Sequence, residues 1–190
     1  SGAWSYSLSA NLPDGNHGAR VTATDAAGNV STLSAAYSIT IDTTAPNAPT
    51  GLALATSSDT GSSHSDGITD NNQPTVQGTA EANSTVTVYV DGTAVGTATA
   101  NGSGAWSYNL ASSLADGNHS IRATATDAAG NISGQSTGYT ITVDTAAPQV
   151  QSFTATDALS TSASTLGYQV VFSKPVVGFN AADLSVVTSG

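Results

Sequence analysis

The feature that most constrains this chain is an internal repeat. Residues 1–46 align without gaps on residues 103–148 at a constant offset of 102 positions, and about two-thirds of the aligned residues are identical. This period is too long for a solenoid unit of about 20–50 residues, but it suits a small β-sandwich. We therefore expect the second half of one module, one whole module and the beginning of a third.

The repeat carries its own boundary marker. The motif Asp-Thr-Thr-Ala-Pro at residues 42–46 returns as Asp-Thr-Ala-Ala-Pro at residues 144–148, each time directly after an alternating apolar run. Proline lacks a backbone N–H and has a fixed φ, so it cannot continue a central strand. The motifs divide the chain into residues 1–46, 47–147 and 148–190. We expect the sequence to be a window from a longer protein, because both outer pieces are incomplete.

Short segments of alternating polarity predict an all-β fold. The middle module has seven such segments separated by turn signals and none of helical period, which favours a Greek-key β-sandwich. Asp91-Gly92 is its strongest hairpin signal. The predicted strands cover 4–8, 19–23 and 37–41, then 52–54, 75–79, 85–90, 93–100, 106–110, 121–125 and 139–143, and finally 150–153 and 166–172.

Composition narrows the functional classes. With 3 Lys+Arg against 13 Asp+Glu and a formal net charge of −10, nucleic acid and anionic membranes are poor partners. There is no Cys, so disulfides and thiol chemistry are excluded. No apolar run approaches the ~18 residues needed to span a membrane. No nucleophile motif stands out, and no pair of carboxylates is framed by a substrate cleft, so we expect no enzyme.

Four motifs carry a family resemblance: Gly-Ala-Trp-Ser-Tyr at 104–108, Leu-Ala-Asp-Gly-Asn-His at 114–119, Ala-Thr-Asp-Ala-Ala-Gly-Asn at 125–131 and Asp-Thr-Ala-Ala-Pro at 144–148. Together they resemble the bacterial immunoglobulin-like repeats of large secreted adhesins, which Gram-negative bacteria export by type I secretion. The resemblance covers residues 1–148. It implies tandem immunoglobulin-like Greek-key β-sandwiches in the extender region of a secreted, cell-surface adhesion protein, with calcium bound where domains meet.

The third module is of another subtype. Residues 168–176 resemble a second family of bacterial immunoglobulin-like domains, in which the position of Lys174 is often acidic. We therefore read residues 148–190 as the N-terminal part of such a domain.

Topology indicates where calcium would bind at the first junction. In a seven-stranded sandwich, the loops after the second and sixth strands share the pole where the chain enters. Glu81 and Asp127 lie on these loops, Asp42 arrives from the preceding module, and Asp14 can approach from that module's own loop. Ca²⁺ takes 6–8 oxygens and would relieve the repulsion between these carboxylates. The alternative is that the aspartates serve their own turns and Glu81 is solvated.

The second junction differs in one charge. Asp144 and Asp116 recur there, but Lys174 stands where a counterpart of Glu81 would be. This substitution predicts either a weaker calcium site or an ion pair between Lys174 and Asp144.

The long loop of the middle module contains three further aspartates, Asp59, Asp66 and Asp70. Two interpretations are open: they form a separate calcium site, or their side chains are solvated. Their spacing does not match that of an EF-hand loop.

Three functions remain open from the sequence. The first is a spacer whose partners are neighbouring immunoglobulin-like domains of the same chain, stiffened by calcium. The second is a module that binds a glycan or a host protein, and the third is a subunit that assembles head to tail into a filament. The near-identity of the repeats favours the spacer, because a recognition site rarely needs copying.

Overall fold

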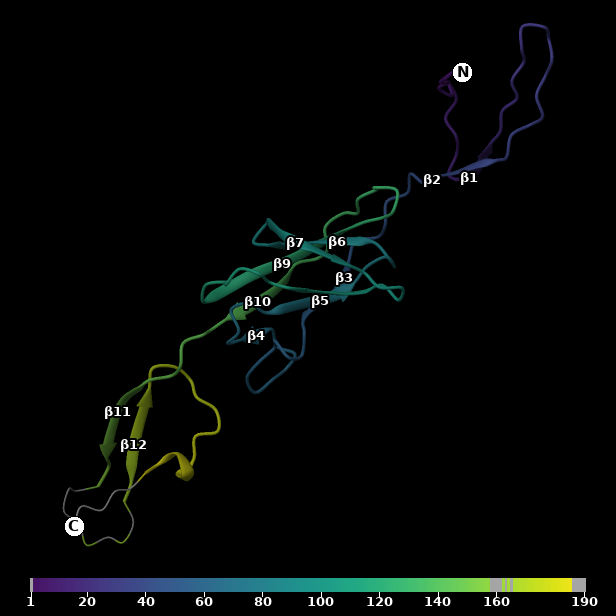
Figure 1. Cartoon of the computed structure of the whole chain (residues 1–190). Helices are drawn as coiled ribbons and strands as arrows, with labels where there is room; N and C mark the ends of the chain where they lie inside the picture. Colours follow the sequence, from purple (N-terminus) through teal and green to yellow (C-terminus); the bar gives the residue numbers. More distant parts are fainter. Residues whose placement is uncertain (1, 158–161, 163, 165, 186–190) are drawn as a thin grey trace. The chain divides into compact units, whose positions relative to one another are not determined.

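The structure, a computed structural model, describes residues 2–157, 162, 164 and 166–185. Within these residues the chain is built from strands and a single short 3₁₀ helix (Figure 1). The elements are β1 (Gly15–Ala19), β2 (Tyr37–Ile41), β3 (Thr50–Leu54), β4 (Ile68–Thr69), β5 (Thr75–Thr79), β6 (Thr85–Val90), β7 (Thr93–Thr99), β8 (Ala105–Asn109), β9 (Gly117–Thr126), β10 (Tyr139–Val143), β11 (Val150–Ala155), β12 (Tyr168–Phe172) and η1 (Ala181–Asp183). No helix in the described part of the chain is long and apolar enough to cross a membrane.

The middle of the sequence forms two sheets. One is five-stranded with the order β4-β10-β9-β6-β7, and the other is three-stranded with the order β3-β5-β8 (Figure 1). Strands β6, β7 and β9 are antiparallel neighbours, whereas the two-residue β4 pairs in parallel with β10. Non-consecutive strands are therefore neighbours in both sheets, and the predicted all-β sandwich is confirmed.

When residues are grouped by how closely their Cα atoms lie, the chain divides into two compact units. The first comprises Ser1–Leu52, Gln77–Tyr108 and Ile121–Tyr139, and the second comprises Ala53–Val76, Asn109–Ser120 and Thr140–Gly190. These units cut across the repeat. The module boundaries at residues 46/47 and 147/148 therefore remain a prediction.

The β6–β7 hairpin has the geometry that its sequence predicts. Asp91 and Gly92 both have positive φ, 50° and 82° respectively, as a two-residue type I′ turn requires. The register places Val90 opposite Thr93. On β6, Val86, Val88 and Val90 are buried on one face.

The core is small and aliphatic, with one tryptophan. Trp106 on β8 is only 4% exposed, and it lies against Gly78 on β5. An added Cβ at Gly78 would stand 2.9 Å from Trp106 Cζ2 and 3.0 Å from the carbonyl oxygen of Thr50. Glycine is therefore required at this position by space. The other buried apolar side chains of the core, among the described residues, are Leu54, Val76, Val86, Val88, Val90, Ala100, Leu110, Ile121, Ala123, Ala125, Ile141 and Val143.

The strand expected over residues 4–8 is wrong. In the structure these residues are not in a strand, and Trp4 is 70% exposed although its repeat equivalent Trp106 is buried. The equivalent strand β8 forms beside β5, whereas residues 4–8 have no strand beside them in the described part of the chain. Alternation of side chains marks a strand only where a partner supplies hydrogen bonds.

The first repeat copy is a β-hairpin-like pair instead of three strands. β1 pairs antiparallel with β2, with Gly15 opposite Ile41 and Ala19 opposite Tyr37. β1 therefore precedes the strand expected over residues 19–23. Beyond it, Thr24 and Val30 form an isolated bridge.

The long loop of the middle module is more ordered than its composition suggested. It contains β4, and Asp59 within it is 2% exposed, so the expectation of a solvated side chain is wrong for this residue. The Asp59 Oδ2 atom accepts a hydrogen bond from the N–H of Gly67 at 3.2 Å, and His64 Nδ1–H donates to the Asp59 carbonyl. The loop folds around this carboxylate, which no local sequence signal revealed.

The third module begins with the antiparallel pair β11–β12, at the two places where the sequence predicted strands. Phe153 stacks on Tyr168 with ring centroids 5.1 Å apart, and Phe172 meets Phe179 edge to face at 5.2 Å. The short helix η1 follows, capped by Asn180.

Substitution of Gly78 tests this packing. We expect Gly78→Ala to lower the free energy of unfolding by about 1–3 kcal/mol, because the new methyl group overpacks the contact with Trp106. Gly102, in the turn before β8, has open space around it, so Gly102→Ala is the matched control, with an expected change within about 0.5 kcal/mol. Urea denaturation followed by circular dichroism measures both. Equal effects would contradict the packing.

Candidate functional site

Aspartate side chains organise several loops of the described chain through networks of hydrogen bonds. In the loop between β9 and β10, the Asp127 Oδ1 atom accepts the N–H groups of Ala129 and Asn131 at 2.9 and 2.8 Å. Its Oδ2 atom accepts the side-chain N–H of Asn131 at 2.8 Å. These bonds, led by that of the Asn131 side chain, hold the pKa of Asp127 below its usual value of 3.8.

The same loop recurs in the first copy. The Asp25 carboxylate accepts the N–H groups of Ala27 and Asn29 and the side-chain amide of Asn29, all within 2.8–2.9 Å. The pKa of Asp25 is lowered by the same side-chain bond. Because the two loops form in very different surroundings, the motif Asp-Ala-Ala-Gly-Asn specifies its own conformation. Gly28 and Gly130 supply the positive φ that the loop needs.

In the middle module this loop reaches the preceding linker. The Asn131 side-chain N–H₂ donates to Asp127 and also to the backbone carbonyl of Asp42, at 3.0 Å. Asp42 is separated from Asn131 by 89 positions in the sequence. Sequence reasoning placed Asp42 and Asp127 at the same pole but missed Asn131, whose constant place in the repeated motif is the signal that identifies it.

The linker after β2 is held from its own module. The Asp14 Oδ1 atom accepts the N–H of Thr43 at 3.1 Å and its hydroxyl at 2.9 Å, and Oδ2 accepts the hydroxyl of Thr44 at 3.1 Å. Asp42 accepts the N–H of Thr44 at 3.0 Å. Chiefly through the Thr43 hydroxyl, this network lowers the pKa of Asp14. Asp14 and Asp42 are therefore both committed to fixing the path of the chain as it leaves β2.

At the second junction, Asp116 repeats part of this arrangement. It accepts the N–H and hydroxyl of Thr145 at 3.1 and 2.8 Å, as Asp14 does with Thr43. Ala146 stands where Thr44 does in the first copy, so the third donor to the carboxylate is missing. The Asp116 carboxylate thus holds its linker with one side-chain hydrogen bond fewer than Asp14 does.

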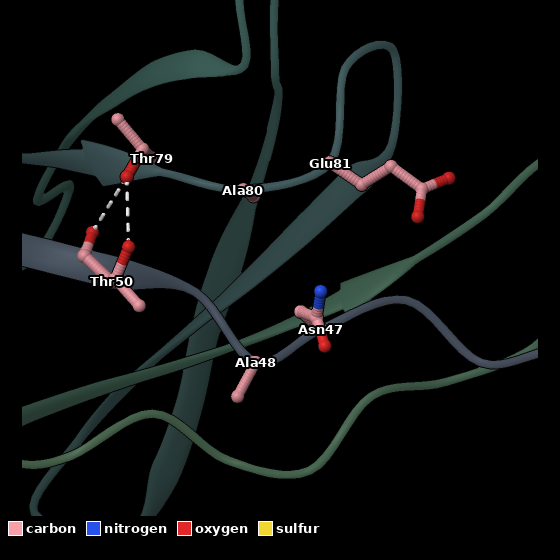
Figure 2. A pocket seen from close by; sticks show the side chains of 6 residues that line it. All are labelled: Asn47, Ala48, Thr50, Thr79, Ala80 and Glu81. Atoms are coloured by element: carbon pink, nitrogen blue, oxygen red, sulfur yellow. Dashed lines mark hydrogen bonds between the residues drawn. The ribbon is translucent and has the colours of Figure 1, made fainter.

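Glu81 lies on the turn between β5 and β6. Its carbonyl accepts the N–H and hydroxyl of Ser84 at 3.2 and 2.7 Å. Its side chain lines a shallow pocket together with Asn47 and Ala48 of the linker, and Figure 2 shows the carboxylate directed away from the hydrogen-bonded pair Thr50 and Thr79. Glu81 therefore stands beside the linker that enters the middle module, as the topology predicted.

The structure brings only some of the carboxylates expected at the first junction close to one another. Asp42 and Asp127 are linked through Asn131, and Asp14 is tied to Thr43 and Thr44. Among the described residues, no three His, Asp or Glu side chains are grouped so as to hold a metal ion.

The second junction contains an ion pair. The Lys174 Nζ atom lies 2.6 and 2.7 Å from the two carboxylate oxygens of Asp144. This was one of the two alternatives that the sequence left open. The hydrogen bond from Lys174 is the leading cause that lowers the pKa of Asp144. Both side chains are partly exposed, so the pair stabilises little by itself but fixes where the linker meets β12 and the turn after it.

The two histidines of the repeat have structural roles. His17 Nε2–H donates to the carbonyl of Pro13 at 2.7 Å, and His119 Nε2–H donates to that of Ala115 at 2.9 Å. Each closes the turn that carries Asp14 or Asp116. The histidines therefore help to position those carboxylates.

Comparison with known proteins identifies the family. The family model described as "Bacterial Ig-like domain" matches residues 1–43 and 45–145. The chain belongs to the family of bacterial immunoglobulin-like domains, and the part that follows residue 145 lies outside the match.

Two solved structures are similar to this chain at low identity. Fibronectin(III)-like modules of Clostridium thermocellum CbhA match with 17% identity and a TM-score of 0.39, covering 70% of this chain and 64% of theirs. A tetra-tandem repeat from the extending region of a large adhesion protein matches with 23% identity and a TM-score of 0.40, covering 77% of this chain and 36% of that one. This chain thus spans less than two-thirds of either relative. No curated protein matches.

Removal of the Asn131 side chain tests the first junction through pH dependence. Because the pKa of Asp127 is lowered in the folded chain, the stability that the loop contributes is present above pH 3.8 and is lost as pH falls through the lowered pKa. Asn131→Ala should raise the pKa of Asp127 toward 3.8 and shift this loss to higher pH. Carboxyl NMR titration measures the change.

Asn29→Ala is the matched control for Asn131→Ala. It should raise the pKa of Asp25 in the same way. However, the amide signals of residues 42–44 should change only in Asn131→Ala, because Asn131 alone of the two bonds to Asp42 in the described structure. A similar response of those amides to both variants would contradict the junction contact.

Removal of the positive charge tests the second junction. Lys174→Gln should raise the pKa of Asp144 toward its usual value of 3.8, since the leading cause of its lowering is gone. Lys174→Arg keeps the charge and should leave that pKa low. NMR titration of Asp144 in both variants decides, and an unchanged pKa in Lys174→Gln would show that the ion pair does not form in solution.

Proposed function

We propose that this chain is a spacer segment of a bacterial cell-surface or secreted adhesion protein, which holds a distal ligand-binding region away from the cell. Membership in the bacterial immunoglobulin-like family and a period of 102 residues within one chain support this proposal. The tetra-tandem repeat, at 23% identity, itself belongs to the extending region of a large adhesion protein. The neighbouring modules of the same chain are the partners that this function requires.

The observation that carries the proposal is the hydrogen bond from Asn131 to the carbonyl of Asp42. A recognition module needs loops that are free to contact a ligand. Here the loop between β9 and β10 uses its functional groups for its own fold and for the linker instead. Asp14 likewise uses its carboxylate to hold Thr43 and Thr44. Asp14 and Asn131, both of which recur in the repeat, are thus directed at the first linker.

Restraint of the linkers is the mechanism of the spacer. Short linkers that contain proline have few backbone conformations, because proline fixes φ and restricts the residue before it. Hydrogen bonds that Asp14 accepts and that Asn131 donates restrict the first linker further, and the Lys174–Asp144 pair acts at the second. Each restraint limits bending, so a string of modules resists collapse toward the cell surface.

Calcium is the additional stiffening element that we propose for the first junction, held by Asp42, Glu81 and Asp127. Asp14 is a weaker candidate, since its carboxylate already accepts three hydrogen bonds. At the second junction, Asp144 is neutralised by Lys174 and Asp116 accepts from Thr145, so calcium should bind there more weakly. A bound divalent ion would supply charge neutralisation that the first junction lacks.

Small-angle X-ray scattering of the full chain with calcium or a chelator tests the proposal. We expect a larger maximum dimension and lower flexibility with calcium. Isothermal titration calorimetry should show tighter binding at the first junction, lost in the double variant Asp42→Asn, Glu81→Gln and retained in Asp66→Asn, a control in the long loop. Equal calcium affinities at the two junctions would contradict the predicted difference between them.

The scattering experiment also separates the two parts of the proposal. A chain that is extended in both conditions supports the spacer and rejects calcium. A chain that remains compact and flexible even with saturating calcium rejects the spacer itself.

A further inference from the structure

The short strand β4 pairs in parallel with β10, at the edge of the five-stranded sheet. The Thr142 N–H donates to the Gly67 carbonyl at 2.8 Å, and the Asp144 N–H donates to the Thr69 carbonyl at 2.9 Å. Thr69 and Val143 are opposite each other in the register, and both are buried. Two backbone hydrogen bonds flanked by buried side chains therefore connect the long loop to the last strand of the middle module.

Asp59 holds the beginning of this pairing in place. Its Oδ2 atom accepts the N–H of Gly67, the residue whose carbonyl bonds to β10. The Asp59 side chain is buried, so water hardly competes for this hydrogen bond. At the other end of β4, the Thr60 hydroxyl accepts the N–H of Asp70 at 2.8 Å. The loop that carries β4 thus fixes both ends of the strand beside β10.

The order of the strands decides how tension along the chain acts on this pairing. The chain reaches β4 from its N-terminal end, after β3, and it leaves the module from the C-terminal end of β10. Because the two strands are parallel, these ends lie at opposite ends of the pair. Tension therefore slides β4 along β10, and both hydrogen bonds have to break together. Release of β3 does not change this loading, since β4 follows β3 in the chain.

We propose that β4 and β10 form a clamp that carries tensile load through the middle module, with Asp59 as its positioning residue. This inference rests on the proposed spacer function, because a segment between a distal ligand-binding region and the cell transmits any pull on that region. Unfolding under force is governed by the unfolding rate, which is slow when several bonds must break at once. The buried Asp59 carboxylate thereby acquires a role separate from the restraint of the linkers.

Single-molecule force spectroscopy of the full chain tests the clamp through its dependence on pulling direction. The chain has no cysteine, so pairs of introduced cysteines define where the handles attach. Ala45→Cys with Ala147→Cys loads β4 and β10 in shear, whereas Asp70→Cys with Ala147→Cys pulls their adjacent C-terminal ends apart. All three positions are exposed. At equal loading rate, the shear geometry should need about twice the unfolding force or more, because two bonds then break together.

Asp59→Ala tests the positioning role, since it removes the acceptor for the Gly67 N–H. It should abolish about half or more of the force difference between the two geometries, because Gly67 is no longer held beside β10. A merely structural loss would lower the force equally in both geometries. Asp59→Asn keeps an oxygen acceptor and should restore most of the difference. Ser65→Ala, at an exposed position of the same loop, is the matched control and should change neither force.

Two results would overturn the clamp: equal unfolding forces in the two geometries when Asp59 is in place, or an equal loss in both with Asp59→Ala. The first comparison does not depend on whether Asp59→Ala folds. The scattering experiment keeps these results apart from the spacer function. Equal forces in a chain that is extended would reject the clamp and leave the spacer in place. A directional force in a chain that stays compact with saturating calcium would support the clamp and reject the spacer.

Discussion

The structure depends on one recurring interaction, in which an aspartate carboxylate accepts several N–H groups of the turn that follows it. Asp25 and Asp127 do so over the five residues of the same motif. The ionised carboxylate is the better acceptor, and the lowered pKa of both groups reflects this. A loop without a hydrophobic core of its own thereby acquires a fixed shape and can position a second side chain, that of Asn131.

This interaction connects local sequence to the geometry of a junction. Asn131 is presented by the Asp127 loop and reaches Asp42, the residue that follows the last strand of the preceding repeat copy. The first linker is therefore held from both sides, by Asp14 behind it and by Asn131 ahead. At the second junction, where the family match ends at residue 145, the linker is held by the Lys174–Asp144 ion pair. The two junctions reach a similar restraint by different chemistry.

Much of the fold follows from the sequence because its signals are local. The Asp91-Gly92 turn, the alternation in β6 and the repeated motifs placed most strands and the poles of the sandwich. The failures are non-local. Residues 4–8 have no strand beside them in the described part of the chain, and burial of Asp59 depends on how a long loop folds around it. The local sequence around these residues does not show whether a partner strand is present or how a long loop folds. Asn131 was missed because its second contact, with Asp42, lies 89 positions away.

Double electron–electron resonance across the first junction is the most direct test of the central claim, that hydrogen bonds restrain the linker. The chain has no cysteine, so Ser38→Cys and Ser107→Cys, both at exposed strand positions, introduce two unique labels. We predict a single narrow distance distribution in the otherwise wild-type chain and a broad one when Asn131→Ala is added. A broad distribution already present with Asn131 in place, in either calcium or chelator, would contradict the account.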